Sequence, residues 1–351
     1  MNVYDSKLWI SDLDETLTYL PELSELEGKS VLITGCYGLI CSAVTDLLIR
    51  WNECHTGKIM IYAAGRSRER TENRFRPYIG KDWFIYVPYD AASSDNVLDF
   101  HCDYIIHGAS NASPNKIVKE PVETMLGNFE GMKNLLDYAV KEETKRVLLV
   151  SSSEVYGKIE SNEPLKDDYY GHINILDPRS SYSIAKCASE TLCTSYAAEY
   201  GTEVVITRPG HIYGPTASMS DIRVSSAWAY AAARGENIVM KSEGTQIRSY
   251  CYCLDCASAI FKVLLRGENV HAYNISNPDS IINIRGMAEL LAKHAGVELI
   301  MELPTETERK RFNPMNNSSL DSTSLMNLGW KGLFSADRGF SHTVEIIKEM
   351  I

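Results

Sequence analysis

The sequence predicts an α/β protein built on a Rossmann-type doubly wound parallel sheet, with a smaller C-terminal α/β region that binds substrate. Short apolar segments alternate with helical segments in units of about thirty residues over the first two thirds of the chain. A glycine-containing turn joins the first apolar segment to the helix that follows it. Beyond these repeats the chain is richer in loops and short strands, which indicates the smaller region.

Composition excludes several classes of protein. The chain has 351 residues, of which 44% are hydrophobic and 23% charged, as in ordinary soluble globular proteins with a large core. A net charge of -11 without a basic block argues against nucleic-acid binding, and no apolar run approaches the ~18 residues of a membrane span. The start lacks a secretion signal pattern, and the nine scattered cysteines suit a reducing compartment. We therefore expect a cytoplasmic protein that binds neither nucleic acid nor membrane.

The alternation of strands and helices divides the chain into three expected parts. The segment Asp12-Leu13-Asp14 is similar to the aspartyl-phosphate motif of haloacid-dehalogenase-type phosphatases. No α/β domain of its own follows it, so we interpret it as part of a helical extension. The expected divisions are an N-terminal extension (1–27), a dinucleotide-binding domain (28–208, with a returning segment at about 237–276) and a substrate-binding region (209–236 and 277–351).

The first apolar segment, Val31–Thr34, predicts a buried strand that leads into the turn and then a helix to about Trp51. Glycines in such a turn let the backbone approach a pyrophosphate, which then lies at the helix N-terminus. Cys41 stands where a third glycine would allow tight packing of the helix on the sheet. The residues of this segment predicted to contact a cofactor are Gly35, Tyr37, Gly38, Leu39 and Ile40.

The second predicted strand, 58–62, lacks the acidic residue that holds the ribose 2′-hydroxyl in NAD enzymes. It is followed by Gly65-Arg66-Ser67-Arg68. Arg66 could bind the 2′-phosphate of NADP or stack on the adenine. NAD is the expected cofactor, and NADP stays open.

Two more strands, 83–87 and 103–109, are predicted before a helix at about 118–141. Asp90 follows the first of these strands, where its carboxylate could reach the adenine amino group. Ala109 ends the second strand and is also expected to contact the cofactor.

The fifth predicted strand, 146–150, runs directly into a serine-rich segment, and a helix at about 180–200 follows. In parallel sheets the carboxyl ends of strands carry the ligand-binding residues. Tyr182 and Lys186 are four residues apart, so they share one face of that helix. Ser152 and Glu154 would point to the same face of an extended segment. A phenol beside an ammonium and a hydroxyl predicts proton transfer.

After a sixth strand at 203–207 the regular alternation stops near His211. Arg223 and Arg248 lie near a helix start and after a turn, and two such arginines suit a diphosphate. We predict no metal site, because a single Cys-x-x-Cys pair near Cys253 has no second pair or histidine beside it. A last strand is expected at 273–276, with helices near 284–295 and 335–350.

These motifs together resemble the extended short-chain dehydrogenase/reductase family, in its group of NAD-dependent sugar-nucleotide epimerases and dehydratases. The resemblance covers residues from about 28 to 345. Within that family the chain looks most like the UDP-glucuronate decarboxylases. The stretches that carry this likeness are Ala109-Ser110-Asn111-Ala112-Ser113-Pro114, Ser152-Ser153-Glu154-Val155-Tyr156-Gly157, Tyr169-Tyr170-Gly171-His172-Ile173-Asn174 and Gln246-Ile247-Arg248.

The resemblance implies a role for each residue of the serine segment and the helix. Ser152 would bind the sugar O4, Tyr182 would be the catalytic base, and Glu154 would match the decarboxylase glutamate. Lys186 would hold the nicotinamide ribose and, with the cationic nicotinamide, lower the pKa of the tyrosine. Ser153 replaces the aspartate of related 4,6-dehydratases, which argues against dehydration.

The resemblance implies two further substrate contacts, His211 and Arg248, beside Arg223, which is predicted from its place near a helix start. His211 stands where the decarboxylases usually have an asparagine that faces the substrate phosphates, so the nucleotide sugar itself stays open. The implied activity passes through a transient 4-keto sugar, with decarboxylation first. A 4-epimerase, a keto-sugar-nucleotide reductase and a non-catalytic nucleotide-binding sensor are the alternatives. The family also implies a homodimer formed through the helices at 118–141 and 180–200.

Overall fold

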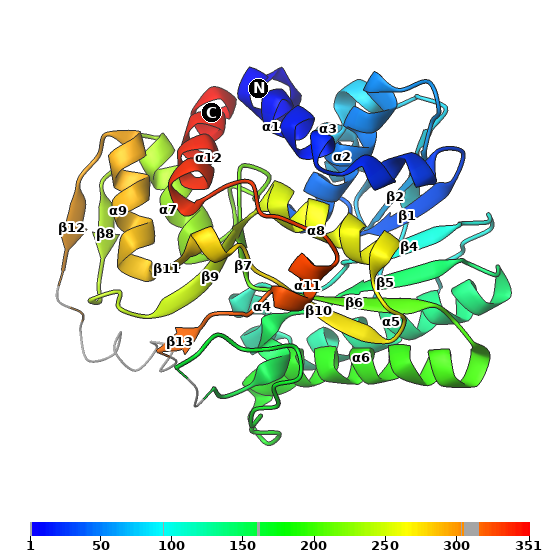
Figure 1. The fold of residues 1–351 in the computed structure, drawn as a ribbon. Helices are drawn as coiled ribbons and strands as arrows, with labels where there is room; N and C mark the ends of the chain where they lie inside the picture. Colours follow the sequence, from blue (N-terminus) through cyan, green and yellow to red (C-terminus); the bar gives the residue numbers. More distant parts are fainter. Residues whose placement is uncertain (1, 94, 160–161, 303, 305–315) are drawn as a thin grey trace.

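The fold is seen in a computed structural model, which describes residues 2–93, 95–159, 162–302, 304 and 316–351. Within these residues, seven strands form one parallel sheet in the order β10-β6-β5-β4-β1-β2-β3 (Figure 1). The predicted Rossmann-type fold is confirmed. The strands of this sheet are β1 (Ser30–Thr34), β2 (Met60–Gly65), β3 (Phe84–Pro88), β4 (Tyr104–His107), β5 (Arg146–Val150), β6 (Val204–Pro209) and β10 (His271–Ile275).

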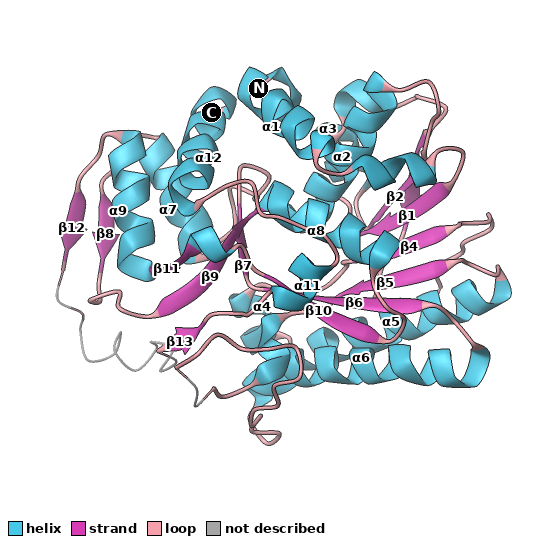
Figure 2. Ribbon diagram, viewed as in Figure 1, coloured by secondary structure: helices cyan, strands magenta, loops and turns pink. Residues whose placement is uncertain are grey.

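Helices cover both faces of this sheet (Figure 2). One face carries α2 (Leu39–Cys54) and α8 (Cys253–Arg266), and the other carries α5 (Pro121–Lys141) and α6 (Ser181–Tyr200). Every residue of β1 is buried, as expected for a parallel strand covered on both sides. Strand order reverses between β1 and β4, which is where open α/β sheets bind ligands. The short helix α3 (Arg68–Arg74) follows β2, and the short helix α4 (Pro114–Lys119) lies directly before α5.

The smaller region is built around β9 (Ile247–Tyr252). Strands β7 (His211–Tyr213) and β13 (Asn317–Ser318) pair parallel with β9, and β11 (Ile281–Asn283) pairs antiparallel with it. A separate pair joins β8 (Ile238–Met240) and β12 (Leu299–Met301). The helices of this region are α7 (Val224–Ala233), α9 (Ile284–Ala295), α11 (Thr323–Asn327) and α12 (Ala336–Met350). No described helix is long and apolar enough to cross a membrane.

The chain returns to the large sheet later than expected. Both β8 and β9 lie within the segment 237–276, yet they pair with strands of the smaller region. The part of that segment that joins the large sheet starts with α8 at Cys253 and ends with β10. Backbone pairing with β7, β11 and β13 holds β9 in the smaller region.

The N-terminal segment is part of the core and not an appendage. Helix α1 (Lys7–Thr18) packs against α2, α8 and α12, and the Trp9 side chain is fully buried. Asp12, also buried, accepts a hydrogen bond from the Tyr252 hydroxyl (3.0 Å) and lies 2.9 Å from Nδ1 of His342. The aspartate is therefore used in packing. The apolar core beneath α2 and α8 continues through α1 into the smaller region.

Candidate active site

The turn after β1 requires glycine for two reasons. Gly35 has a φ of +73°, and a Cβ there would lie 3.0 Å from the backbone of Ala109. Gly38 precedes α2, whose first turn receives no hydrogen bond from a capping side chain. The free backbone N–H groups of that turn can bind a pyrophosphate, because Gly35 and Gly38 have no Cβ that would block its approach.

Cys41 occupies the position of a third glycine without loosening the packing. A Cβ added to Gly108 at the end of β4 would lie 2.3 Å from the Cys41 Sγ. The close approach of α2 to the sheet is thus provided by Gly108, on the opposite side of the contact. Burial raises the pKa of the Cys41 thiol to about 12, so it packs as a small apolar group.

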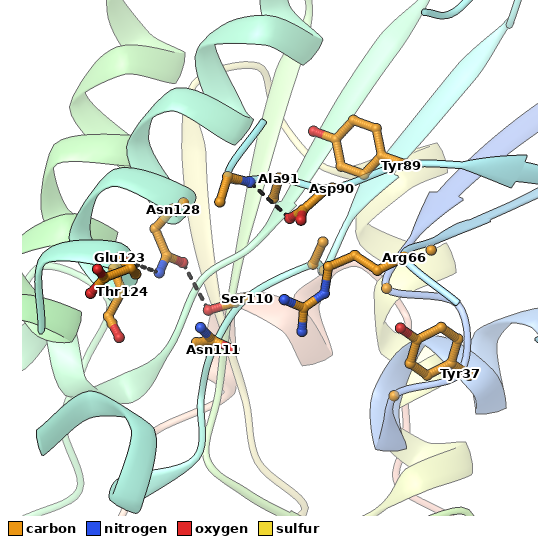
Figure 3. Close-up of a pocket in the computed structure, with 17 residues that line it drawn as sticks. Tyr37, Arg66, Tyr89, Asp90, Ala91, Ser110, Asn111, Glu123, Thr124 and Asn128 are labelled. Carbon is orange, nitrogen blue, oxygen red and sulfur yellow. Dashed lines mark hydrogen bonds between the residues drawn. The ribbon is translucent and has the colours of Figure 1, made fainter. Parts of the chain in front are cut away.

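An open pocket with about 710 Å³ of empty space begins at this turn (Figure 3). Its lining includes six residues predicted to bind a cofactor, namely Gly35, Tyr37, Gly38, Arg66, Asp90 and Ala109. Leu39 and Ile40 are not among the lining residues. They begin α2, where Leu39 is buried and its carbonyl accepts a hydrogen bond from Thr216 (2.9 Å).

The lining fits a dinucleotide at the adenosine end as well. The Asp90 carboxylate accepts a hydrogen bond from the Ala92 N–H through Oδ1 (3.1 Å). Among the described residues its Oδ2 has no hydrogen-bond partner, so this oxygen can accept one from an adenine amino group. The pocket also contains Glu123 and Asn128, which were missed in the sequence.

Ser110 connects this pocket to the catalytic residues. It lines the pocket, donates a hydrogen bond to Asn128 Oδ1 (2.8 Å) and lies close enough to the phenol of Tyr182 to lower its pKa. Ser152 lowers the pKa of the same phenol. The sequence contained a signal for Ser110, since it belongs to the stretch that begins at Ala109 and carries the family likeness.

The chain alone raises the pKa of Tyr182, opposite to the direction implied by the resemblance. Burial, followed by the Glu154 carboxylate, raises it to about 12, against the hydrogen bonds of Ser152 and Ser110. The Lys186 ammonium is 5.9 Å from the centre of the tyrosine ring and donates to the Val150 carbonyl (2.9 Å). Burial lowers the pKa of Lys186 to about 8.

A buried ion pair lies one helical turn beyond Lys186. Glu190 accepts a hydrogen bond from the Ser151 hydroxyl (2.5 Å) and two from the Arg208 guanidinium (3.0 and 2.6 Å). Its charge raises the pKa of Lys186 against the effect of burial. Tyr182, Lys186 and Glu190 thus form one stripe along α6, and only the first two were predicted.

Ser152 and Glu154 do not lie on an extended segment, because β5 ends at Val150 and Ser153–Tyr156 form a 3-10 helix. Ser152 caps this helix by accepting a hydrogen bond from the Glu154 N–H (3.2 Å), and Ser153 begins it. Both Ser152 and Glu154 still act on Tyr182.

The Glu154 carboxylate is reached by solvent but has protein on several sides. Desolvation raises its pKa, while a hydrogen bond from Ser183 (3.3 Å) and the charge of Arg179 lower it. This combination of solvent access and desolvation is typical of a concave surface, where a substrate would bind.

The three predicted phosphate contacts come together in the smaller region. His211 on β7 faces β9, which carries Arg248, and Arg223 immediately precedes α7. Desolvation by the surrounding protein, then the charges of Arg248 and Arg223, lower the pKa of His211 to about 4, although solvent reaches its side chain. The ring is therefore neutral. Arg223, which is paired with Asp221 (3.0 Å), also lowers the pKa of Tyr182, so its charge acts on both His211 and the phenol.

The profile of the NAD dependent epimerase/dehydratase family matches residues 31–276. The UDP-glucuronic acid decarboxylase 1 of Danio rerio is 30% identical over 341 residues, which cover 95% of this chain and 77% of that protein. The UDP-glucuronic acid decarboxylase 6 of Arabidopsis thaliana is 30% identical over 284 residues, which cover 80% of each chain.

Solved structures share the fold at lower identity. The UDP-glucose 4-epimerase of Thermus thermophilus in complex with NAD has a TM-score of 0.76 and 21% identity, covering 92% of this chain and all of that one. RMD of Pseudomonas aeruginosa complexed with NADPH has a TM-score of 0.71 and 20% identity, with the same coverage. The likeness to both structures shows a common fold for the two cofactor types.

Proposed function

This chain belongs to the NAD-dependent epimerase/dehydratase family, and on that premise we propose that it is a UDP-glucuronate decarboxylase-like enzyme that acts through a transient 4-keto sugar. The names of the relatives that are 30% identical over most of the chain support this proposal. The observation that carries it is the exposed Glu154 carboxylate, which lies close enough to the Tyr182 phenol to raise its pKa.

In the proposed reaction, a bound nicotinamide dinucleotide supplies the hydride acceptor, and later the hydride donor, at the sugar C4. Tyr182 takes the proton of the C4 hydroxyl, and Ser152 holds that oxygen by a hydrogen bond. The resulting ketone makes the C6 carboxylate that of a β-keto acid, so the C5–C6 bond breaks and carbon dioxide leaves. Glu154 positions this end of the sugar, and the C5 carbanion takes up a proton before C4 is reduced again.

The residues of the smaller region would hold the nucleotide. Arg223 and Arg248 carry the positive charge for a diphosphate, and His211, being neutral, adds a hydrogen-bonding group. Arg223 would also favour the phenolate form of Tyr182, whose pKa must fall well below 12 for proton removal at neutral pH.

A reductase of a keto-sugar nucleotide is the second candidate. It is favoured by Arg66, a basic side chain in the pocket where an NAD site has an acid. A 4-epimerase needs no carboxylate at position 154, so the effect of Glu154 separates it from the decarboxylase.

The test is incubation of the protein with UDP-glucuronate, UDP-glucose and UDP-N-acetylglucosamine, with and without NAD, followed by proton NMR. A UDP-pentose from the first substrate supports the proposal. A C4-inverted sugar would indicate an epimerase, and a product that requires stoichiometric NADPH a reductase.

Two variants sharpen this test. Tyr182→Phe should lose at least ~100-fold in turnover, the usual contribution of a positioned base, whereas the exposed Tyr170→Phe should keep full turnover. Glu154→Gln should lose pentose formation and retain hydride removal from C4. Full turnover by Tyr182→Phe would refute the mechanism, and binding without turnover of any sugar nucleotide would favour a sensor.

We also propose a homodimer formed through α5 and α6, which lie side by side on one face of the sheet (Figure 1). Helix α5 exposes a row of apolar side chains that no described residue covers. These are Val122, Met125, Leu126 and Phe129.

A further inference from the structure

We infer that the cofactor pocket selects NADP over NAD, with Arg66 and Arg70 binding the 2′-phosphate beyond the end of β2. This rests on the proposed function in one respect, because it assumes that the pocket holds a nicotinamide dinucleotide. These two guanidinium groups would recognise the negative charge of the 2′-phosphate.

The end of β2 is placed directly against the turn that would hold the pyrophosphate. Thr34 on β1 is in register with Ala64 on β2, and the Cys36 N–H donates to the Ala64 carbonyl (3.2 Å). The Tyr37 ring of the turn lies over Gly65, where a Cβ would be only 2.7 Å from it. The next residue, Arg66, therefore stands beside the position of the adenosine ribose, where an NAD site has a carboxylate.

Arg66 extends into the pocket, with Tyr37 on one side and Asp90 on the other (Figure 3). It is the one basic side chain among the described lining residues, whose acidic members are Asp90 and Glu123. Within the described part of the chain its guanidinium makes no hydrogen bond or ion pair. A positive charge that projects into a ligand pocket without a protein partner is available to an anion.

Arg70 does not line the pocket itself, but it places a second positive charge against Tyr37, which does. Its guanidinium lies over the ring of Tyr37, 5.6 Å from the ring centre, and makes no ion pair with a described residue. Arg68 between them is different, because it pairs with Glu72 (3.1 Å) and its guanidinium lies over the ring of Tyr86, outside the pocket lining. The remaining acid of this helix, Glu69, is exposed and does not line the pocket either.

The chemistry separates two uses of Arg66. A 2′-phosphate carries nearly two negative charges and several acceptor oxygens, so two guanidinium groups would bind NADP and gain little from the 2′-hydroxyl of NAD. Stacking of Arg66 on the adenine would instead stabilise both dinucleotides equally, because both contain adenine.

The test measures binding by calorimetry without any sugar nucleotide, using NADP and NAD and the fragments adenosine 2′,5′-bisphosphate and 5′-AMP. Wild type should bind the 2′-phosphorylated member of each pair about 10- to 100-fold more tightly, as expected for charge-assisted hydrogen bonds. This preference should shrink as salt rises. Arg66→Ala should lose most of the preference and leave NAD binding nearly unchanged, and Arg66→Asp should favour NAD.

The control is Arg68→Ala, which removes a neighbouring arginine that is already paired and lies outside the pocket lining. It should leave both affinities as they are, and thermal unfolding should show that all variants remain folded. Equal losses of NAD and NADP in Arg66→Ala would indicate stacking and overturn the inference, as would tighter binding of NAD by wild type.

The same measurements keep the two proposals apart. Tight NADP binding without turnover of any sugar nucleotide would support this inference and refute the proposed function. Decarboxylation with NAD preferred over NADP would do the reverse, and failure to bind either dinucleotide would overturn both.

Discussion

At the scale of single residues, the site is a set of buried charges along one face of α6. Burial is the largest cause of the shift of both Tyr182 and Lys186 toward their neutral forms, and with their neighbours the pKa is about 12 for the phenol and about 8 for the ammonium. Glu190, held by Arg208, opposes this at the lysine. The ion pair behind the site therefore helps to keep Lys186 charged.

The sign of the effect on stability follows from the lowered pKa of Lys186. The unfolded chain binds this proton up to a pH of about 10.4, whereas the folded chain releases it near 8. Burying the ammonium therefore costs stability below pH 8, and this cost disappears as the pH rises through the interval between the two values.

Glu190→Gln should move the alkaline limb of the rate profile to lower pH. Removing this carboxylate lowers the pKa of Lys186 further, so the ammonium is lost earlier as the pH rises. The measurement is kcat against pH, with the exposed Glu199→Gln on the same helix as the control. A variant that is merely less stable, with an unchanged limb, would contradict this role of Glu190.

At the scale of elements, the turn after β1 and helix α5 show how local conformation prepares a surface. The turn needs glycine both for its φ and for the approach of β4, whereas the C-terminus of α6 at Gly201 needs it for φ alone (+72°). Helix α5 carries apolar side chains on part of its exposed side as well as on its buried side.

Gly35→Ala should abolish dinucleotide binding, because its Cβ would be forced into the backbone of Ala109. The strain of a positive φ should lower the free energy of unfolding by about 1–3 kcal/mol. Gly201→Ala carries the same φ strain with no atom within 4 Å of the new Cβ, so it should lose stability and keep binding. Calorimetric titration with the cofactor measures binding by the two variants, and denaturant unfolding measures their stability. Equal binding by both would refute the role of Gly35 in holding the cofactor.

Leu126→Glu should convert the proposed homodimer to a monomer, because a charge cannot be buried at a helix interface without a partner. Static light scattering at micromolar concentration measures this, and Val239→Glu on β8, an exposed apolar side chain elsewhere, should stay dimeric. A wild-type protein that is already monomeric would refute the proposed homodimer.

At the scale of the whole molecule, α1 joins the two regions that enclose the site. It packs on α2 and α8 of the large domain and on α12 of the smaller region. Asp12 hydrogen-bonds Tyr252, and Arg338 on α12 pairs with Glu15. The relative position of the cofactor pocket and the arginine cluster thus depends partly on the first helix of the chain.

Asp12→Ala should lower the free energy of unfolding by about 2–5 kcal/mol, since it leaves the buried Tyr252 hydroxyl and His342 without their acceptor. Asp14→Ala, two residues away on the same helix, should cost at most ~1 kcal/mol because its ion pair with Arg50 is half exposed. Denaturant unfolding compares the two, and equal losses would show that the buried network contributes nothing.

What the sequence could reveal followed from local pattern. The apolar segments, the spacing of Gly35 and Gly38, and the four-residue step from Tyr182 to Lys186 each act over a few residues, so they predicted the parallel sheet, the turn and the shared helix face. Even here the expected extended segment from Ser152 to Glu154 was wrong, because Ser152 caps a 3-10 helix that starts at Ser153.

Only the tertiary structure decided the contacts between distant parts of the chain. Different strands or helices meet in each of these contacts: Cys41 fills the space left by Gly108, Ser110 lies near the Tyr182 phenol, and Glu190 pairs with Arg208. The same holds for the packing of α1 and the late return of the chain at α8. Periodicity reports which residues face the interior, but the choice of partner there depends on shape and charge brought together by the fold.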